Sequence, residues 1–527
     1  MKRNVVIGCF LFVVTVCFSQ AYFFVRFSDK GNPCAYTVEN PCDFLSNRAI
    51  ERRVAHGIVI DSTDFPVHAA YLDAIQSLGL TLKHTSRWLN GATFLATDTS
   101  VMAQVRALPF VVYTQCTKKL SGGKRKISDK LAFTKGNHGT ATTQIEMLRI
   151  DSLHALNFKG DNIHIAVIDA GFYKLDTNPG FERFRSNGQL LGVRDFVGDS
   201  IDIYKADAHG MHVLSTIVGY LPENYMGSAP NASCWLLRTE DVASETLLEI
   251  DNWVAAVEFA DSAGVDIITS SLGYSTFDDA STNFSYADMN GRTVRNSIVA
   301  TMAARKGILV LNSAGNEGNK PWRYITTPAD ADSILTVGSV GASCSPSPFS
   351  SFGPSSDGRI KPDVCAMGGM TALINADGYT FSGNGTSFST PIMAGAVACL
   401  WQALPQLSCI EIANLVRQNS SQSEYPDSIM GYGIPDMVRA YYGASSQLSR
   451  TETGVISVYP NPATDVVSIV VPAGAVKITI TDLFGREIWR STVGGTCTIN
   501  CSEWSQGIYF VTVTANHKRL VSKIIKK

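Results

Sequence analysis

Short apolar runs alternate with amphipathic segments through the middle of the chain, and this alternation restricts the fold more than any other feature. The runs Ile163–Ile168, Val265–Ser270 and Ile308–Asn312 have the length and composition of buried strands. Segments with helical apolar spacing, Ser244–Ala263 and Ile298–Lys306, lie between them. The pattern predicts an α/β domain in which helices cover both faces of a parallel sheet.

Polar residues follow these runs directly. Asp169 comes after the first run, the segment Ser271-Leu272-Gly273 after the second, and Asn316 shortly after the third. In open parallel sheets, ligands bind outside the carboxyl ends of the strands. We therefore expect these three segments to meet in one cleft.

A glycine-flanked serine and a histidine complete a reactive set. Ser387 lies in Gly-Thr-Ser-Phe-Ser-Thr-Pro, residues 385–391, and His209 begins His-Gly-Met-His-Val. The order Asp169, His209, Ser387 is one of the known orders of the hydrolytic triad. A serine hydroxyl needs an imidazole to take its proton and a carboxylate to orient that imidazole. The sequence predicts Ser387 as nucleophile at the start of a helix over Thr386–Leu404, His209 as general base and Asp169 as its partner.

These segments resemble those of the subtilisin-like serine proteases, the subtilases. The serine segment is similar to the family's Gly-Thr-Ser-Met-Ala-Thr-Pro, and the histidine segment to His-Gly-Thr-His-Val, whose first histidine is the catalytic one. The segment Ser313–Gly318 resembles the one that carries the oxyanion-hole asparagine, which implies that role for Asn316. Ser271, Leu272 and Gly273 resemble the strand end that binds the substrate backbone. The resemblance covers about residues 145–445 and implies a serine endopeptidase with an acyl-enzyme on Ser387.

The N-terminal part indicates export in a precursor form. Residues 1–21 have the basic start and apolar run of a secretory signal peptide, and the run is shorter than the ~20 residues of a membrane span. Residues 22–117 have mixed helical and strand patterns, typical of a small α+β domain, and their position resembles that of an inhibitory subtilase prodomain. An ordinary attached N-terminal domain is the alternative. Residues 118–144 are rich in lysine, glycine and serine and predict an exposed linker, a good protease target.

The C-terminal part, residues 452–527, alternates apolar and polar residues between turn signals, which predicts a small all-β sandwich. Its Tyr-Pro-Asn-Pro start, Asp-Leu-Phe-Gly-Arg turn and lysine-rich end resemble the sorting domain of the type IX secretion system. The resemblance implies passage through that machinery in a Bacteroidota-type bacterium, then secretion or attachment to the outer membrane. A generic β accessory domain is the alternative.

Ten cysteines follow the signal segment, and an exported protein can form disulfides. Cys34 with Cys42, and Cys344 with Cys365, are candidate pairs, while buried free thiols are the alternative. The expected hydrolysis requires no cofactor, and the sequence gives no metal-ligand set. Structural calcium stays open without assigned ligands, because the acidic pairs lack EF-hand spacing. These pairs are Asp199 with Asp202, Asp278 with Asp279, and Asp330 with Asp332.

Two other functions have to be weighed. An esterase of the α/β-hydrolase type needs Gly-x-Ser-x-Gly and the order Ser, Asp, His, and Ser387 fits neither. A catalytically inactive surface binding protein or adhesin with the same fold stays open, because fold alone does not guarantee chemistry. The net charge of −2 argues against a nucleic-acid partner. The expected partners are protein or peptide substrates, the chain's own prodomain and the type IX machinery.

Overall fold

The computed structural model describes residues 20–31, 34–120, 141–198, 202–452, 457–470, 475–494, 496–515 and 518–527. Most of the expected signal segment and residues 121–140 of the expected linker lie outside these ranges. The chain forms two compact units, residues 1–440 and residues 441–527.

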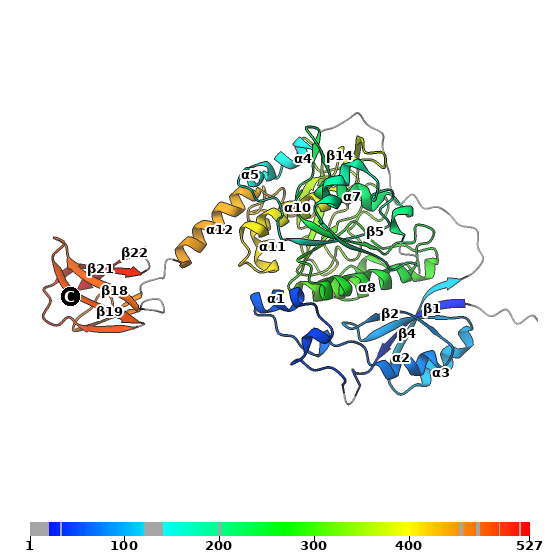
Figure 1. Ribbon diagram of the computed structural model, residues 1–527, viewed down its shortest axis with the longest axis horizontal. Coiled ribbons are helices and arrows are strands. Elements are labelled where there is room, and N and C mark those ends of the chain that lie inside the picture. Colours follow the sequence, from blue (N-terminus) through cyan, green and yellow to red (C-terminus); the bar gives the residue numbers. More distant parts are fainter. Residues whose placement is uncertain are drawn as a thin grey trace, which may run out of the picture. The chain divides into compact units, whose positions relative to one another are not determined.

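A parallel sheet of seven strands forms the centre of the first unit, which confirms the predicted α/β fold. Helices α8 (Leu247–Ala263) and α9 (Arg295–Arg305) pack on one face, and α7 (His209–Val218) and α10 (Thr386–Ala403) on the other (Figure 1). In spatial order, the strands are β13 (Val364–Met367), β12 (Leu335–Val340), β11 (Leu309–Ser313), β10 (Ile267–Ser270), β5 (His164–Asp169), β9 (Ser233–Arg238) and β6 (Leu190–Asp195).

Apolar side chains from the sheet and from the helices form the main core of this unit. Ile168, Ile268 and Val310 of three adjacent strands pack with Trp253 of α8 and Val299 of α9, and all five are fully buried. The strands diverge in chain order from β5, since β9 and β6 lie on one side of it and β10 to β13 on the other. Such a switch in strand order opens a crevice at the carboxyl ends of the strands, where the polar segments lie.

The N-terminal domain combines an antiparallel sheet with helices, which confirms the predicted α+β class. Its strands are, in order, β2 (Thr81–Ser86), β3 (Gly91–Ala96), β1 (Gln20–Phe27) and β4 (Val111–Leu120). The helices α2 (Ala69–Gln76) and α3 (Met102–Ala107) lie on the side away from α8, and β2 and β4 contact α8 (Figure 1). The strand β4 continues three residues into the range that we expected to be linker, because Lys118 and Lys119 find carboxylate partners across the interface.

A further helix of this domain, α1 (Asn47–Ala55), packs against the C-terminal end of α8. That end is capped by Gly264 in the left-handed region, with φ of 82°. A Cβ atom at Gly264 would lie 2.8 Å from the backbone nitrogen of Ala49 and from Cβ of Arg48. The absence of a side chain at this position therefore lets the two helices meet.

Three guanidinium groups of the N-terminal domain surround one carboxylate of α8. Arg52, Arg53 and Arg87 bond the side chain of Asp261 at 2.5, 2.9 and 2.5 Å. Asp261 is fully buried, and the arginine side chains are at most 10% exposed. We call these four residues the ionic anchor. Arg53 also bonds Asp64 at 2.8 Å, so the charges of the arginines are shared between two carboxylates.

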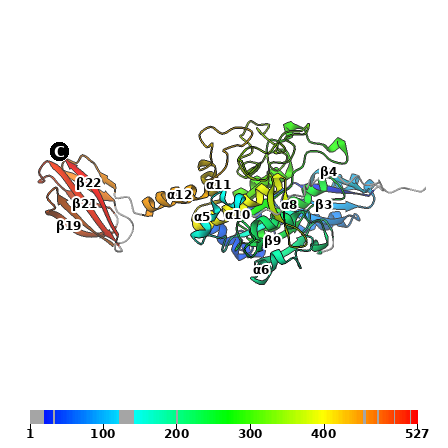
Figure 2. The same cartoon turned by 90° about the horizontal axis from the view of Figure 1, so that it is seen from above.

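The second unit contains two antiparallel sheets, which confirms the predicted all-β sandwich. Val467 and Ile469 from one sheet pack with Ile478 and Val511 from the other. The last two strands, β21 and β22, run side by side (Figure 2). One sheet has β16 (Ser457–Tyr459), β17 (Val466–Val470) and β20 (Cys497–Asn500), and the other has β19 (Glu487–Gly494), β18 (Ala475–Asp482), β21 (Gly507–Ala515) and β22 (Lys518–Lys526). Helix α12 (Met437–Glu452) crosses the boundary between the units.

Neither candidate disulfide forms, because all ten cysteines between Cys34 and Cys501 are free thiols. Cys365 is buried within β13, where its Sγ lies 3.6 Å from the carbonyl oxygen of Met430, whereas Cys344 lies exposed in a turn. No helix in the described part of the chain is long and apolar enough to cross a membrane.

Candidate active site

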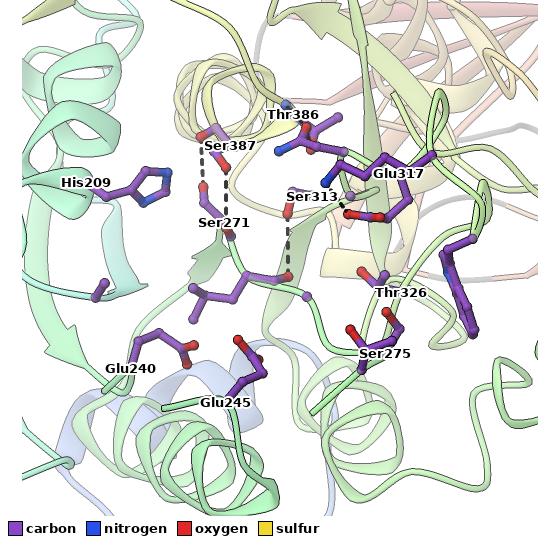
Figure 3. A pocket seen from close by; sticks show the side chains of 18 of the residues that line it. His209, Glu240, Glu245, Ser271, Ser275, Ser313, Glu317, Thr326, Thr386 and Ser387 are labelled. Carbon is purple, nitrogen blue, oxygen red and sulfur yellow. Dashed lines mark hydrogen bonds and ion pairs between the residues drawn. The ribbon is translucent and has the colours of Figure 1, made fainter. Parts of the chain in front are cut away.

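The three residues predicted to form a triad lie together at the carboxyl ends of the strands. Asp169 is the last residue of β5, His209 is the first residue of α7, and Ser387 is the second residue of α10. His209 and Ser387 line a cleft of about 420 Å³, and Asp169 is fully buried behind His209. Figure 3 shows the imidazole of His209 pointing across this cleft toward Ser271 and Ser387.

A short hydrogen bond joins the first two residues. Nδ1 of His209 donates to Oδ1 of Asp169 at 2.7 Å, and the backbone N–H of Ala170 donates to the same oxygen at 2.7 Å. Burial alone would lower the pKa of His209, but the charge and the hydrogen bond of Asp169 hold this pKa above its ordinary value. The imidazole is therefore fixed in orientation and prepared to accept a proton.

The residue after His209 explains how α7 comes so close to β5. A Cβ atom at Gly210 would lie 2.5 Å from the carbonyl oxygen of Gly171 and 2.8 Å from Cβ of Asp169. Asp207 accepts a hydrogen bond from the backbone N–H of His209 at 2.7 Å and so fixes the start of the helix. The His-Gly pair in the sequence is thus a requirement of packing as well as of chemistry.

The second histidine of α7 lies in an apolar environment. The ring of His212 packs against Phe381 with ring centres 5.0 Å apart, and burial lowers the pKa of His212 to about 3. His212 is therefore neutral at ordinary pH, and its ring contributes to packing.

Ser387 is held against the end of β10. Its Oγ donates to the carbonyl oxygen of Ser271 at 3.5 Å, and Oγ of Ser271 donates to the carbonyl oxygen of Ser387 at 2.8 Å (Figure 3). Among the hydrogen bonds of the described residues, none joins Ser387 to His209. The hydroxyl thus faces β10 in this state of the protein.

The side chain of Asn316 is oriented by the residue before Ser387. Its Oδ1 accepts from the backbone N–H of Thr386 at 2.9 Å and lies 3.0 Å from Oγ1 of the same residue. Because a backbone N–H can only donate, the accepting atom of Asn316 has to be the oxygen. The amide NH₂ group is consequently the part of Asn316 left to donate elsewhere in the cleft.

The segment predicted to bind substrate also lines the cleft. Ser271, Leu272 and Gly273 all contribute to its wall. The carbonyl oxygen of Leu272 accepts from Nδ2 of Asn312 at 2.9 Å, and a Cβ atom at Gly273 would lie 2.1 Å from Oγ1 of Thr326. Only glycine fits between this wall and Thr326.

Comparison with known proteins decides the family. Residues 160–433, just over half of the 527-residue chain, match the subtilase family, peptidase S8. The chain belongs to the subtilases. Residues 22–132 match the peptidase S8 propeptide domain of Bacteroidota, and residues 457–527 match the secretion system C-terminal sorting domain. These matches identify a serine protease of Bacteroidota that is secreted or carried at the cell surface.

The relatives are bacterial subtilases of moderate identity. The chain is 28% identical over 288 residues to subtilisin DY of Bacillus licheniformis, covering 54% of this chain and 92% of that protein. It is 29% identical over 266 residues to subtilisin NAT of Bacillus subtilis subsp. natto, covering 50% of this chain and 61% of that protein. It is 27% identical over 304 residues to the serine protease AprX of Bacillus subtilis, covering 52% of this chain and 65% of that protein.

The far end of the cleft in this subtilase is acidic, which the sequence analysis missed. Glu240 and Glu245 line it, and Figure 3 places both carboxylates at the end opposite Ser387. Glu240 is 2% exposed and accepts a hydrogen bond from the hydroxyl of Tyr274 at 2.5 Å. Glu240 lies two residues beyond the carboxyl end of β9, and Asp169 is the last residue of β5. The same strand-end rule would therefore have found Glu240 if β9 had been recognised.

Protein groups already satisfy several acidic side chains considered for calcium. Asp278 accepts from the backbone N–H of Glu245, Asp279 pairs with Lys119, and Asp330 accepts from Ser297 at 2.6 Å. Within the described residues, no group of three or more His, Cys, Asp or Glu side chains is arranged to hold a metal ion.

Proposed function

We propose that this subtilase hydrolyses peptide bonds of protein substrates through an acyl-enzyme on Ser387. His209 is the general base, and Asp169 orients its imidazole. The observation that carries the proposal is the 2.7 Å bond between Asp169 and His209 in the cleft that Ser387 also lines. The chemistry needs only these side chains, so we propose no cofactor.

The reaction begins when the hydroxyl of Ser387 turns from Ser271 toward His209. His209 takes the proton at Nε2 while Oγ attacks the carbonyl carbon of the substrate. The amide of Asn316 and the backbone N–H of Ser387 donate to the oxyanion, and one such donor contributes about 2.7–4 kcal/mol to the transition state. The C–N bond then breaks as His209 protonates the leaving amine, and water later releases the acyl group. Asp169 stays ionised and stabilises the imidazolium.

Substrate binds as an extended strand beside the segment Ser271–Gly273. Backbone hydrogen bonds give affinity in this mode, and pockets for side chains give preference. Leu272 lies between Ser271 and the exposed backbone of Gly273, so the segment offers an edge that a substrate strand can join.

The chain reaches its site of action as a precursor. We propose that residues 1–21 are a cleaved signal peptide and that the prodomain inhibits the enzyme until the chain is cut within the basic linker. The C-terminal sandwich then directs passage by the type IX system and attachment to the outer membrane.

One observation favours a second candidate, a subtilase-fold binding protein without catalysis. The Ser387 hydroxyl bonds Ser271 and not His209 in this state. Catalytic hydrogen bonds are often long before substrate binds, however, and no catalytic group is missing. The two candidates differ in whether Ser387 can be activated.

A fluorophosphonate probe tests this difference. We expect the purified protein to be labelled at Ser387, and Ser387→Ala to lose labelling and at least about 10⁴-fold in peptide hydrolysis. Ser389→Ala is the matched control, because Ser389 lies outside the cleft and its hydroxyl only bonds the carbonyl of Thr386 within α10. A prodomain-free, folded protein that stays unlabelled would contradict the proposed hydrolysis and favour the binding-protein candidate.

A further inference from the structure

The acidic end of the cleft is built by two loops that are fixed to each other. The backbone N–H of Glu245 donates to the carboxylate of Asp278 at 3.0 Å, and the N–H of Asp278 donates to the carbonyl of Glu245 at 2.9 Å. One loop, residues 240–245, carries Glu240, Asp241 and Glu245. The other, residues 275–279, carries Asp278 and Asp279. The two walls therefore present five carboxylates in a fixed arrangement.

Few cations of the catalytic domain compensate this charge. Among the described residues that line the cleft, His209 and Lys320 are the basic ones, and Lys320 bonds Glu317 at 3.0 Å. Glu240 is 2% exposed, so its charge acts through a medium of lower dielectric constant than water. The negative field of this end is consequently directed into the cleft.

The chain already places a basic segment against these walls. Nζ of Lys118 donates to Asp241 at 3.1 Å and to Oγ of Ser244 at 2.9 Å, and Nζ of Lys119 donates to Asp279 at 3.1 Å. Successive side chains of a strand point to opposite sides. The two consecutive lysines at the end of β4 thus bridge the two walls, one lysine to each.

The two lysines lower the pKa values of the carboxylates that they bond, Asp241 and Asp279. Burial would raise the pKa of Asp241, but Lys118 and hydrogen bonds from Ala243 and Ser244 hold this pKa below its usual range. Hydrogen bonds from Ser281 and Lys119 lower the pKa of Asp279 to about 2. Both groups are charged over the pH range in which His209 can act as a base.

We propose that this acidic end selects substrates that carry lysine or arginine on the acyl side of the scissile bond. Glu240 and Glu245 bind a cationic side chain within the cleft, and Asp241 and Asp279 bind further basic residues at its rim as they bind Lys118 and Lys119. This preference rests on the proposed function, since it concerns substrates that are cut at Ser387. The acidic end and Ser387 lie at opposite ends of one cleft, and a substrate strand bound beside Ser271–Gly273 runs between them. The substrate class is therefore extended, basic polypeptide segments.

Matched peptides test this preference with the enzyme from which the prodomain has been cut and released. Each peptide carries either lysine or uncharged norleucine at one position before the scissile bond, and kcat/KM is measured for both. We expect the lysine peptide to be favoured about tenfold at one or more positions, since cleft and rim carboxylates act together. Added salt should reduce this ratio, because it screens exposed charges.

Two variants test whether Glu240 and Glu245 cause the preference for lysine. Glu245→Gln removes a charge from the half-buried wall, and Glu240→Gln keeps an acceptor for the Tyr274 hydroxyl. We expect each to lower the lysine-to-norleucine ratio about threefold to fivefold, and the pair to bring it close to one. Glu182→Gln is the matched control, since this exposed glutamate of α6 (Glu182–Ser186) lies outside the cleft and the same charge change there should leave the ratio unchanged.

Two results would overturn the proposal: a ratio near one at every position in the unmodified enzyme, or a tenfold ratio that survives both substitutions. Hydrolysis of the norleucine peptides and labelling of Ser387 distinguish these results from failure of the proposed function. Absence of all hydrolysis and all labelling would overturn both. The thermal transition of each variant shows whether it is folded. If Glu240→Gln does not fold, the lysine-to-norleucine ratio of Glu245→Gln alone tests the proposal.

Discussion

Two of the regions in which the prodomain contacts the subtilase domain differ in how completely they exclude water. In the ionic anchor, Asp261 is fully buried among three arginines. At the acidic end of the cleft, the side chains of Lys119 and Asp279 are 65% and 46% exposed. Breaking one partner of a buried charge pair costs about 3–5 kcal/mol, whereas an exposed pair contributes about 0–1 kcal/mol. We therefore expect the ionic anchor to retain the prodomain, and the ion pairs of Lys118 and Lys119 at the rim of the cleft to contribute little to its binding.

The two regions lie at opposite ends of the same helix. Glu245 precedes the first turn of α8, and Asp261 lies in its last turn. The fourteen residue steps from Leu247 to Asp261, at 1.5 Å each, span about 21 Å. Substitutions in the ionic anchor and at the rim of the cleft should thus change prodomain binding independently.

The largest expected effect comes from Asp261→Asn. The substitution removes the charge that neutralises Arg52, Arg53 and Arg87 while keeping the shape of the side chain. We expect prodomain binding to weaken by about 3–5 kcal/mol, measured as the inhibition constant of added prodomain. Asp266→Asn is the control, because Asp266 pairs with the 35%-exposed Arg48 and should cost less than about 1 kcal/mol. Equal effects of the two substitutions would contradict the distinction between the regions.

A change of pH should have an intermediate effect on prodomain binding. Nε2 of His84 in the prodomain donates to the carbonyl of Phe196 and to Oδ1 of Asn252, both at 2.9 Å, and burial lowers the pKa of His84 to about 4. The bound state therefore favours neutral His84, while the free prodomain protonates near the ordinary pKa of about 6.5. Binding should be complete above pH 6.5, weaken about tenfold by pH 5.5 and continue to fall toward pH 4.

His84→Gln sharpens this prediction, since glutamine keeps a donor but does not titrate. The variant should lose most of the pH slope of prodomain binding between pH 6.5 and 4. His56, which packs against Trp401 and whose pKa is lowered by burial, accounts for a remaining slope in the same direction. A full slope in the variant would assign the pH dependence to other groups.

The smallest effect is expected from Lys118→Gln together with Lys119→Gln. Both ion pairs are at least partly exposed, so their loss should weaken prodomain binding by less than about 1 kcal/mol each and mainly at low salt. Inhibition constants at 50 and 500 mM NaCl check this. If this pair cost more than Asp261→Asn, the cleft would be the site that retains the prodomain.

The sequence predicted the fold class and the residues of the candidate site because each carries its own local signal. Asp169 ends an apolar run, Ser387 opens an apolar helix, and Asn316 lies in a glycine-rich segment. Their glycine neighbours mark close backbone approach, as Gly210 shows. Such features depend on residues within one or two turns of each other, which a pattern can report.

The prodomain interface could not be predicted in this way. Arg52 is 209 positions from Asp261, and Lys118 is 123 positions from Asp241, so no local pattern pairs them. Lysine-rich Lys118 and Lys119 have the composition of a solvated linker, and only the position of their carboxylate partners extends β4 to include them. The two candidate disulfides failed for the same reason, since the spacing of Cys344 and Cys365 does not show that Cys344 is exposed while Cys365 is buried within β13.

The ionic anchor also has a consequence for timing. Before the proposed cut, the prodomain belongs to the same chain as the subtilase domain, so it rebinds as an intramolecular partner. After the cut, the inhibitor is a separate molecule, and its escape rate from Asp261 sets the interval before the cleft opens. Buried charges slow that escape, whereas dilution outside the cell prevents return. The anchor would act as a delay, so that activity begins only after the precursor has left its site of synthesis.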